Sequence, residues 1–402
     1  MKVSIIPSKA VGTVKAPPSK SIAHRALLAG ALTDGSEIGN IAYSKDIEAT
    51  LLCLSEMGAS VKRQENSVLI GGLEPYNVTN NAVLPCNESG STLRFLLPIC
   101  MLCGHPVTLK GTKRLFERPL TVYENIAKEH NIFWQQGEDY VTVCGNLKSG
   151  RYTVPGNISS QFITGLLYAL LTLKEDSEIV ITKRLESASY INLTISTLQE
   201  FGITIKHTPT GFYVPGGQKV SARHYTVEGD YSNAAFLEGL NLLGGNVKVE
   251  GLLEDSLQGD RAYRQMFSQL LSGKREFDLS DCPDLAPVMF ALAAAKGGAN
   301  FTGTARLRFK ESDRAAAMAE ELQKFGIKLI VKDNLVTVPA GVLMPPCTPL
   351  NSHNDHRIAM ALALLCTVTG GTICGAMAVN KSFPDFFDTL KYLKIGLTTH
   401  DS

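Results

Sequence analysis

The feature that most constrains this chain is an internal repeat. A polar stretch, an apolar helix rich in small residues, a Gly or Asp/Gly turn and a short β-branched strand recur six times in 402 residues. The apolar helices begin near these residues: Arg25, Arg94, Gln161, Asn233, Ala286 and Arg357. Neighbouring copies lie roughly 70 residues apart, except for a step of roughly 50 between the fourth and the fifth. This regularity predicts one supersecondary unit built six times.

Each copy continues with an amphipathic helix. In YINLTISTLQEFG (residues 190–202), Ile191, Ile195 and Leu198 share one face. Most of these helices are expected to end at a glycine in a left-handed C-cap, as at the following positions: Gly58, Gly202, Gly273 and Gly326. A strand pair follows, as in IKLIVKDNLVTVP with its turn at Asp333 and Asn334. Each unit is therefore predicted to be helix, strand, helix and strand pair.

The two kinds of helix predict the layering of the fold. First helices such as MFALAAAKGG (residues 289–298) are apolar nearly all round, which predicts that they are buried, with the sheets outside them. We therefore expect an α/β fold of two domains with three units each, since the length also suits two domains. The first would span residues 15–228 and the second residues 1–14 and 229–402, with the active site in the cleft between them. The crossovers are expected near 11–18 and 226–232.

Charge and hydropathy exclude some classes of protein. Lysine and arginine number 39 and aspartate and glutamate 38, giving a net charge of +1. The basic excess typical of nucleic-acid binders is absent, so no nucleic-acid partner is expected. No stretch of about 18 apolar residues predicts a membrane-spanning helix. The apolar start, Val3 to Ile6, is too short for a signal peptide.

The cysteines suggest a reducing compartment. All nine are scattered through apolar stretches, which favours free buried thiols and a cytoplasmic location. Cys100 and Cys103 form the one close pair and leave a metal or redox role open. Their position in the apolar run FLLPICMLC favours core packing instead.

The polar stretches before the first helices hold the candidate chemistry. They are PSKSIAHR (18–25), NESGSTLR (87–94), GNISSQF (156–162), GDYSNAA (229–235), DCPDLAP (281–287) and NDHRIAM (354–360). Helix capping explains their Ser, Asn and Asp residues. It does not explain the cations Lys20, Arg25, Arg94 and Arg357, because a cation at a helix N-terminus opposes the macrodipole. A bound anion would resolve this conflict.

Further cations lie on the connecting loops: Arg118, Lys310, Arg314 and Lys381. Arginine suits a bidentate grip on carboxylate or phosphate. Together these residues predict a pair of small substrates that carry several negative charges, held without an obligatory metal.

Two carboxylates are candidates for proton transfer. Asp284 starts an apolar helix among cations and is a candidate general base, while Glu311 is a candidate proton donor. Each has a structural alternative, since Asp284 could simply cap its helix and KESDR also resembles a capping box. A purely structural role also stays open for four further residues: His24, His356, Ser159 and Ser160.

Nucleotide and metal motifs are missing. The chain has no GxxxxGK[ST] loop, no GxGxxG after a strand, and no HExxH or paired CxxC. We therefore expect neither a cofactor nor a metal.

Seven motifs, in order along essentially the whole chain, resemble one enzyme family. They are PSKSIAHRALLAGAL, SGSTLR, LFERP, SSQFITGLLYAL, RFKESDR, NDHRIAMALAL and KSFPDFF. They are similar to those of the 5-enolpyruvylshikimate-3-phosphate (EPSP) synthases, or 3-phosphoshikimate 1-carboxyvinyltransferases. The resemblance implies an inverse α/β barrel of two domains, each made of three βαβαββ units with buried helices.

The resemblance also implies an activity. The family transfers the enolpyruvyl group of phosphoenolpyruvate to the 5-hydroxyl of shikimate 3-phosphate through a tetrahedral intermediate, and releases phosphate. This step belongs to the shikimate pathway of chorismate and aromatic amino acid biosynthesis, and glyphosate inhibits it by competing with phosphoenolpyruvate. A monomer is the default expectation.

The matching positions imply roles for particular residues. Implied contacts of shikimate 3-phosphate are Lys20, Ser21, Arg25, Ser159, Ser160, Gln161, Ser187, Tyr190, Asp284 and Lys310. Implied contacts of phosphoenolpyruvate are Lys20, Gly90, Arg118, Gln161, Arg314, Arg357 and Lys381. Asp284 would accept the proton of the 5-hydroxyl, Glu311 would protonate the methylene carbon, and Lys20, Lys381 and His356 would complete the catalytic set.

Some positions depart from the family's pattern. Glu88 and Ser91 flank Gly90 where many members carry asparagine and threonine, which leaves glyphosate sensitivity open. Arg306 stands where some members have an asparagine that contacts the shikimate phosphate, so that role is not carried over.

Two other interpretations of the sequence remain. The enolpyruvyl transferase that acts on UDP-N-acetylglucosamine shares the fold, but it lacks PSKS and uses a loop cysteine that has no match here. A non-enzymatic anion-binding repeat protein, or a relative of the RNA-terminal phosphate cyclases, is the alternative from another class. The near-neutral charge and the lack of basic-aromatic runs disfavour nucleic acid.

Overall fold

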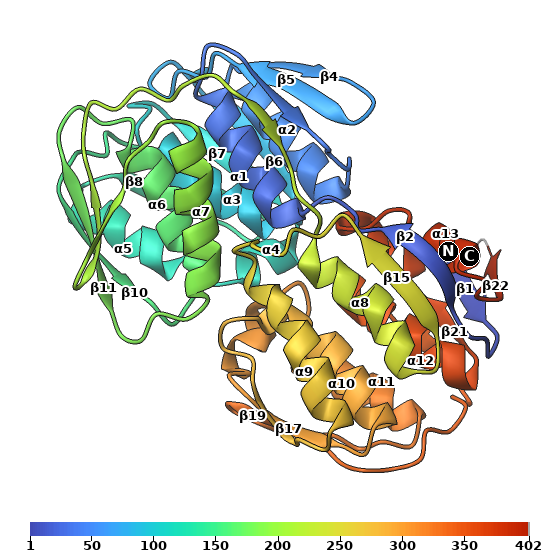
Figure 1. Cartoon of the computed structure of the whole chain (residues 1–402). Helices are drawn as coiled ribbons and strands as arrows, with labels where there is room; N and C mark the ends of the chain where they lie inside the picture. The colour runs from blue at the N-terminus through green and yellow to red at the C-terminus, as the bar shows by residue number, and fades with distance from the viewer. Residues whose placement is uncertain (401–402) are drawn as a thin grey trace. The chain divides into compact units, whose positions relative to one another are not determined.

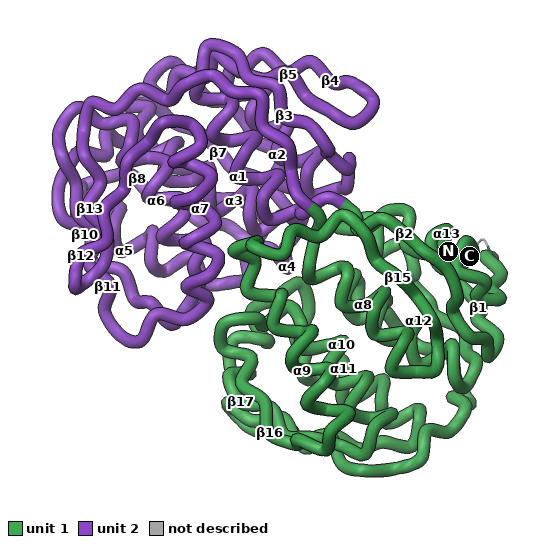
Figure 2. The backbone as a smooth tube through the Cα atoms, viewed as in Figure 1, with its two compact units in different colours: residues 1–17, 229–402 green, residues 18–228 purple. Residues whose placement is uncertain are grey.

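The computed structural model describes residues 1–400. The chain divides into two compact units, called unit 1 (residues 1–17 and from 229 onward) and unit 2 (residues 18–228), as Figure 2 shows. Each unit contains three of the six repeats. No helix in residues 1–400 combines the length and the apolar character that crossing a membrane requires.

Unit 2 contains the first three repeats (Figure 1). The first consists of α1 (Lys20–Ala31), β3 (Ser36–Gly39), α2 (Lys45–Glu56), β4 (Ser60–Arg63) and β5 (Ser67–Gly71). The second consists of β6 (Ala82–Asn87), α3 (Gly90–Cys100), β7 (Val107–Gly111), α4 (Lys113–Glu117), α5 (Thr121–Glu129), β8 (Phe133–Gln136) and β9 (Tyr140–Cys144). The third consists of β10 (Arg151–Pro155), α6 (Ser160–Leu170), β11 (Ser177–Thr182), α7 (Ala188–Glu200), β12 (Lys206–Thr208) and β13 (Gly211–Val214).

Each repeat of unit 2 has a four-stranded sheet of the same topology. In the order β6-β7-β9-β8, the first pair is parallel and the other two are antiparallel. The third repeat follows this pattern as β10-β11-β13-β12. The first repeat takes its parallel partner from the end of the unit, where β14 (His224–Thr226) pairs with β3. The last strand of unit 2 therefore completes its first sheet.

Unit 1 contains the other three repeats. The fourth consists of β2 (Val11–Lys15), α8 (Tyr231–Leu242), β15 (Asn246–Glu250), η1 (Gly259–Arg261) and α9 (Ala262–Leu271). The fifth consists of β16 (Glu276–Asp278), η2 (Pro283–Leu285), α10 (Ala286–Ala295), β17 (Ala299–Thr302), η3 (Ala305–Phe309), α11 (Arg314–Lys324), β18 (Ile330–Lys332) and β19 (Leu335–Val338). The sixth consists of β20 (Leu350–Asn351), α12 (His356–Thr369), β21 (Gly371–Cys374), η4 (Ala376–Lys381), α13 (Phe386–Tyr392), β22 (Leu397–His400) and β1 (Lys2–Ile5).

The chain's first strands complete two sheets of unit 1. β2 pairs in parallel with β15, and β1 lies between β21 and β22 in the order β20-β21-β1-β22. The fifth repeat has the regular order β16-β17-β19-β18.

The fourth repeat differs from the prediction of a strand pair in every unit. Its sheet has two strands, β15 and β2, and no hairpin follows α9. Only four residues, Ser272–Arg275, separate the end of α9 from β16, which is too few for two strands and a turn. The missing hairpin explains the short step between the fourth and fifth repeats.

The predicted layering is confirmed. Every residue of α10 from Ala286 to Ala294 is buried, whereas α11 buries one face and exposes the other. In Figure 1, β17 and β19 lie along the outside of unit 1, with α10 inside them. Each unit has its own hydrophobic core, built largely from these first helices.

Local predictions are also confirmed. Gly58, Gly202, Gly273 and Gly326 all have positive φ directly after a helix C-cap. Asp333 and Asn334 form the two-residue turn between β18 and β19, where Lys332 faces Leu335. All nine cysteines are free, and Cys100 and Cys103 are buried in the core of unit 2.

Candidate active site

Four helix N-termini of unit 1 meet around the carboxylate of Asp284. Asp284 lies in η2, directly before α10. Its Oδ1 accepts hydrogen bonds from Lys310 Nζ at 3.1 Å and from Arg314 Nη1, at the start of α11, at 2.8 Å. Its Oδ2 accepts from Arg357 Nη2, at the start of α12, at 2.9 Å, and the same Nη2 lies 2.9 Å from Ser232 Oγ at the start of α8. Because three cations bind its side chain, Asp284 is not a simple helix cap.

A second carboxylate, that of Asp355, binds the side chain of Arg314. It is fully buried and caps α12 by accepting from the backbone N of Arg357 at 2.9 Å. Its Oδ2 accepts from Arg314 Nε at 2.9 Å and from Ser312 Oγ at 3.1 Å. Arg314 also donates from Nη2 to Glu311 Oε2 at 2.8 Å. The buried Arg314 guanidinium is therefore held by three carboxylates.

The charges in this cluster shift one another's pKa values. Burial by itself raises the pKa of Asp284, but the attraction of Arg357, Lys310 and Arg314 outweighs it and holds that pKa well below its usual value. Burial lowers the pKa of Lys310, and Asp284 only partly offsets this. Asp284 is therefore ionised at neutral pH, and Lys310 loses its proton more easily than an exposed lysine.

Arg357 retains capacity for a ligand. Its side chain is buried, and its Nε and Nη1 have no hydrogen-bond partner among the described residues. Leaving such donors unpaired is costly, whereas an anion would satisfy them. This observation favours an anionic ligand at the N-terminus of α12.

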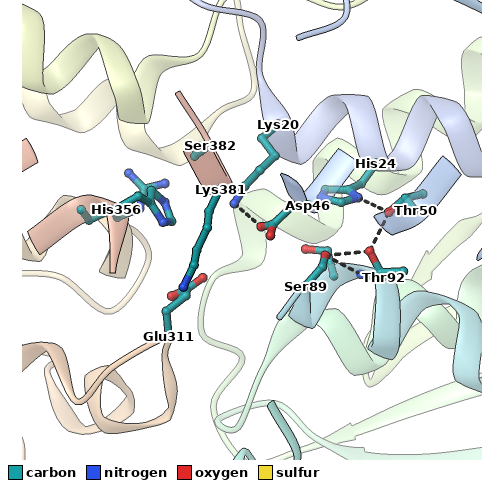
Figure 3. A network of polar contacts seen from close by, with 12 residues as sticks. Lys20, His24, Asp46, Thr50, Ser89, Thr92, Glu311, His356, Lys381 and Ser382 are labelled. Atoms are coloured by element: carbon teal, nitrogen blue, oxygen red, sulfur yellow. Dashed lines mark hydrogen bonds and ion pairs between the residues drawn. The ribbon is translucent and has the colours of Figure 1, made fainter. Parts of the chain in front are cut away.

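The remaining candidates of unit 1 lie at the ends of neighbouring elements. Lys381 ends η4 and donates to the backbone carbonyl of Asn354, just before α12. His356 is the first residue of α12, with Nδ1 3.9 Å from Asp355 Oδ1. Figure 3 shows His356, Lys381 and Glu311 as sticks. Glu311 does not form a capping box, because Asp313 caps α11 by accepting from the backbone N of Ala316 at 3.1 Å.

In unit 2, a chain of hydrogen bonds links the starts of α1 and α3 (Figure 3). His24 Nδ1 lies 2.8 Å from Thr50 Oγ1, which lies 2.6 Å from Thr92 Oγ1, and Thr92 donates to Ser89 Oγ at 2.7 Å. Burial, followed by the charges of Lys20 and Arg25, lowers the pKa of His24 well below its usual value. His24 is therefore neutral and hydrogen-bonded through Nδ1, while its buried Nε2 has no hydrogen-bond partner among the described residues.

Two cations of α1 have defined partners. Lys20 Nζ lies 2.6 Å from Asp46 Oδ2 at the start of α2. Arg25 donates from Nε to Thr194 Oγ1 at 2.8 Å, from Nη1 to the Ser21 carbonyl at 2.6 Å and from Nη2 to the Tyr190 carbonyl at 2.9 Å. Burial lowers the pKa of Arg25 to about 10. Arg25 thus ties α1 to the start of α7, where Ser187 is the N-cap residue.

Gln161 connects the starts of α3 and α6. Its Oε1 accepts from Arg94 Nη1 at 2.8 Å, and its Nε2 donates to Ser91 Oγ at 3.0 Å. Ser159 caps α6 by accepting from the backbone N of Gln161 at 3.3 Å, and Ser160 is the first residue of that helix. The capping role of Ser159 is confirmed, and it leaves the hydroxyl's donor capacity for a ligand.

Gly90 opens α3 against the side chain of Arg118. A Cβ at position 90 would lie 2.8 Å from both Cζ and Nη2 of Arg118 and closer still to Nη1. Only glycine therefore lets this guanidinium lie against the first turn of α3.

Within each unit, the structure brings the predicted helix-start residues together. Three residues that were not predicted as site residues each contact a predicted cation: Asp46, Asp355 and Ser232. All three lie at helix starts, which was the only available signal. Arg306 also lies in this region, where its side chain donates to the Ser280 carbonyl.

Two α/β units of repeated strand–helix elements, with carboxylates and cations at their helix starts, define an enzyme that acts on small anionic substrates. The family model of EPSP synthase (3-phosphoshikimate 1-carboxyvinyltransferase) matches residues 5–390, and the chain belongs to this family.

Relatives match over nearly their full length. The 3-phosphoshikimate 1-carboxyvinyltransferase of Clostridium novyi is 40% identical, covering 98% of this chain and 97% of that protein. The Clostridioides difficile enzyme of the same name is 38% identical, with 97% of both covered. A solved structure of EPSP synthase from Acinetobacter baumannii has the same fold, with a TM-score of 0.80, 21% identity and full coverage of both chains.

Proposed function

We propose that this chain transfers the enolpyruvyl group of phosphoenolpyruvate to the 5-hydroxyl of shikimate 3-phosphate and releases phosphate. It acts in the shikimate pathway of aromatic amino acid biosynthesis, and glyphosate inhibits it. Family membership over nearly the whole chain supports this activity. The structural observation that best supports the proposed activity is the environment of the Asp284 carboxylate. It lies where helix N-termini meet and binds three cations, Lys310, Arg314 and Arg357.

Both units contribute to the proposed active site. Unit 2 supplies most contacts of shikimate 3-phosphate: Lys20, Ser21, Arg25, Ser159, Ser160, Gln161, Ser187 and Tyr190. Unit 1 adds Asp284 and Lys310. Phosphoenolpyruvate contacts Lys20, Gly90, Arg118 and Gln161 of unit 2 and Arg314, Arg357 and Lys381 of unit 1. The guanidinium groups grip the carboxylate and phosphate of phosphoenolpyruvate in the bidentate way that arginine favours.

The cations around Asp284 make its basicity depend on the substrate. Without substrate they stabilise the carboxylate and hold its pKa low, so that it is a weak base. Bound phosphoenolpyruvate brings negative charge to Arg314 and Arg357, which weakens their hold on Asp284 and raises its pKa. Asp284 then accepts the proton of the 5-hydroxyl only once both substrates are present.

The remaining steps follow from the neighbouring groups. Glu311 protonates the methylene carbon of phosphoenolpyruvate, C2 becomes cationic, and the 5-hydroxyl oxygen adds to it. Reversing the proton transfers expels phosphate from the tetrahedral intermediate. Lys20, Lys381, Arg314 and Arg357 stabilise the charge on the departing phosphate. His356 is the first residue of α12 and precedes Arg357 in the chain.

Phosphate release tests this proposal directly. Purified protein is incubated with phosphoenolpyruvate and either shikimate 3-phosphate or UDP-N-acetylglucosamine. Release with shikimate 3-phosphate alone supports the proposal, release with the nucleotide sugar alone would identify the sister activity, and release with neither would favour a binding protein.

We also propose that the chain acts as a cytoplasmic monomer without a nucleic-acid partner. The net charge of +1 and the nine free cysteines support this, since a reducing compartment keeps thiols unpaired. Sedimentation at micromolar concentration tests the oligomeric state.

A further inference from the structure

Outside the proposed substrate contacts, one buried ion pair lies on the second half of α11. The carboxylate of Glu321 is completely buried, and its two oxygens each lie 2.9 Å from Lys324 Nζ. Oε1 also lies 3.0 Å from His353 Nε2, and Oε2 accepts from the backbone N of Asn351 at 2.9 Å. All partners of this carboxylate outside α11 therefore come from the short segment that precedes α12.

The Glu321 carboxylate is ionised at neutral pH. Burial raises the pKa of Glu321, but the hydrogen bonds from His353, Lys324 and Asn351 lower it by more. The hydrogen bond to Glu321 raises the pKa of His353 despite partial burial. A charge-assisted hydrogen bond is stronger than a neutral one, so this contact is well suited to hold a backbone in place.

The Glu321 carboxylate contacts the segment before α12, and this segment contains two residues with an unfavourable backbone conformation. His353 and Asn354 are consecutive residues with φ of +50° and +52°, in the left-handed region that L-residues avoid. Such a conformation persists only where surrounding contacts enforce it. Ser352 supplies some of them, since its Oγ accepts from the backbone N of Asn354 at 3.3 Å. Asn351 supplies another, since its Oδ1 accepts from the backbone N of His353 at 2.9 Å, and Glu321 adds the contact to the His353 ring.

This turn leads directly into the proposed active site. The carbonyl of Asn354 accepts a hydrogen bond from Lys381, and the next residue, Asp355, binds Arg314 and caps α12. Arg314 and Glu321 lie seven residues apart on α11 and therefore share one face of that helix. One face of α11 thus contacts both ends of the segment 351–355, through Glu321 at Asn351 and through Arg314 at Asp355.

We propose that Glu321 and His353 are positioning residues for phosphoenolpyruvate. Their hydrogen bond holds the left-handed turn at residues 353–354. It thereby sets the Asn354 carbonyl that orients Lys381, and the Asp355 carboxylate that orients Arg314. Neither residue touches substrate. This inference rests on the proposed function.

A metal site would be the alternative use of these side chains. In residues 1–400, Glu320, Glu321 and His353 form a group whose ligand-type atoms all lie within 4.8 Å of one another. However, the Lys324 ammonium contacts both oxygens of Glu321 and occupies the place of a cation. The geometry therefore favours an ion pair.

Two substitutions of His353 isolate the hydrogen bond. His353→Gln keeps a donor near the position of Nε2, whereas His353→Ala removes it, and neither residue favours the left-handed region. The side chain of His353 is 20% exposed, so both variants are expected to fold. The matched control is Glu320→Gln, because Glu320 is 61% exposed and its carboxylate lies 3.9 Å from His353 Nε2.

Steady-state kinetics with both substrates give the first readout. For His353→Ala we expect kcat/KM for phosphoenolpyruvate to fall about tenfold, with binding of shikimate 3-phosphate alone changed less than about twofold. For His353→Gln and Glu320→Gln we expect kcat/KM within about threefold of the wild type. A wild-type value for His353→Ala, or equal losses in the Ala and Gln variants, would overturn the proposal.

A crystal structure of unliganded His353→Ala gives a readout that does not depend on activity. We expect residues 353–354 to leave the left-handed region and the Asn354 carbonyl to move away from Lys381. If the wild type releases no phosphate, the proposed function fails while this structure still tests the positioning role. An unchanged turn with Lys381 still bound to it would refute that role.

Discussion

Gly90 lies so close to the guanidinium of Arg118 that no side chain fits between them. A methyl group at position 90 would have to displace Arg118 from the first turn of α3. Since Arg118 is proposed to bind phosphoenolpyruvate, this contact links a single backbone position to the affinity for one substrate.

Gly90→Ala is therefore expected to raise the KM for phosphoenolpyruvate about tenfold, which corresponds to about 1.4 kcal/mol of binding free energy. Glyphosate, as a competitor for the same site, should inhibit the variant less. Initial rates at varied phosphoenolpyruvate measure both effects. Gly39→Ala is the control, because a Cβ there would meet its nearest atom, Thr226 Oγ1, at an ordinary 3.8 Å. An unchanged KM for Gly90→Ala would contradict the proposed link between this contact and the affinity for phosphoenolpyruvate.

Asp284→Asn keeps the size of the side chain and removes its charge. We expect turnover to fall by about 10²–10⁴-fold, the usual range for loss of a general base. Shikimate 3-phosphate binding, measured by calorimetry, should remain detectable because most of its proposed contacts lie in unit 2. Asp281→Asn, at an exposed position three residues earlier, is the control. Full activity in Asp284→Asn would exclude the proposed proton acceptor.

Arg25→Lys tests whether this buried cation holds unit 2 together. A lysine cannot donate simultaneously to Thr194, Ser21 and Tyr190, so buried acceptors lose their partners. We expect a loss of about 1–3 kcal/mol in the free energy of unfolding, measured by urea titration. Arg151→Lys, at a site where the arginine side chain is 67% exposed, should change stability by less than about 0.5 kcal/mol. Equal stabilities of the two variants would show that the hydrogen bonds of Arg25 do not stabilise unit 2.

The Glu321–His353 pair predicts a bell-shaped pH dependence of stability. The pKa of Glu321 is lowered below 4.5, so its contribution is complete above that pH and is lost as the pH falls through the folded-state value. The pKa of His353 is raised above 6.5, so its contribution is complete below 6.5 and is lost as the pH rises through the folded-state value. The difference in Tm between wild type and Glu321→Gln should thus be largest between pH 4.5 and 6.5.

Calorimetry of the wild type, Glu321→Gln and the control Glu320→Gln measures this profile. About 1 kcal/mol corresponds to a few degrees in Tm for a unit of this size. A Tm difference that does not vary with pH would mean that packing, and not charge, accounts for the effect of Glu321.

The repeat and the cations at helix starts could be predicted from the sequence because both are local. Periodicity places Arg357 at the start of a buried helix, and the cost of a cation there points to an anion. The partners of these cations could not be found in this way. Asp355 binds Arg314, 41 residues away, and Asp46 binds Lys20, 26 residues away, through contacts that depend on how separate helices pack.

The missing hairpin of the fourth repeat shows another limit of the pattern. The spacing of the repeats differed at this place, but the sequence offered no reason to choose between a shorter loop and a lost element. The glycine at position 90 was assigned by resemblance alone, since its need arises from Arg118, 28 residues later in the sequence. Sequence reasoning thus finds the positions of charge, whereas the tertiary structure determines what each charge faces.

The strand order of unit 1 has a consequence for biosynthesis. β1 is translated before the other strands of its sheet, yet its place lies between β21 and β22, near the other end of the described residues. Unit 2, being continuous in sequence, can fold while translation is still under way. In unit 1, β2 stays unpaired until β15 is made, and β1 stays unpaired until β21 and β22 follow. Removing Lys2–Ile5 would therefore take an interior strand out of a sheet.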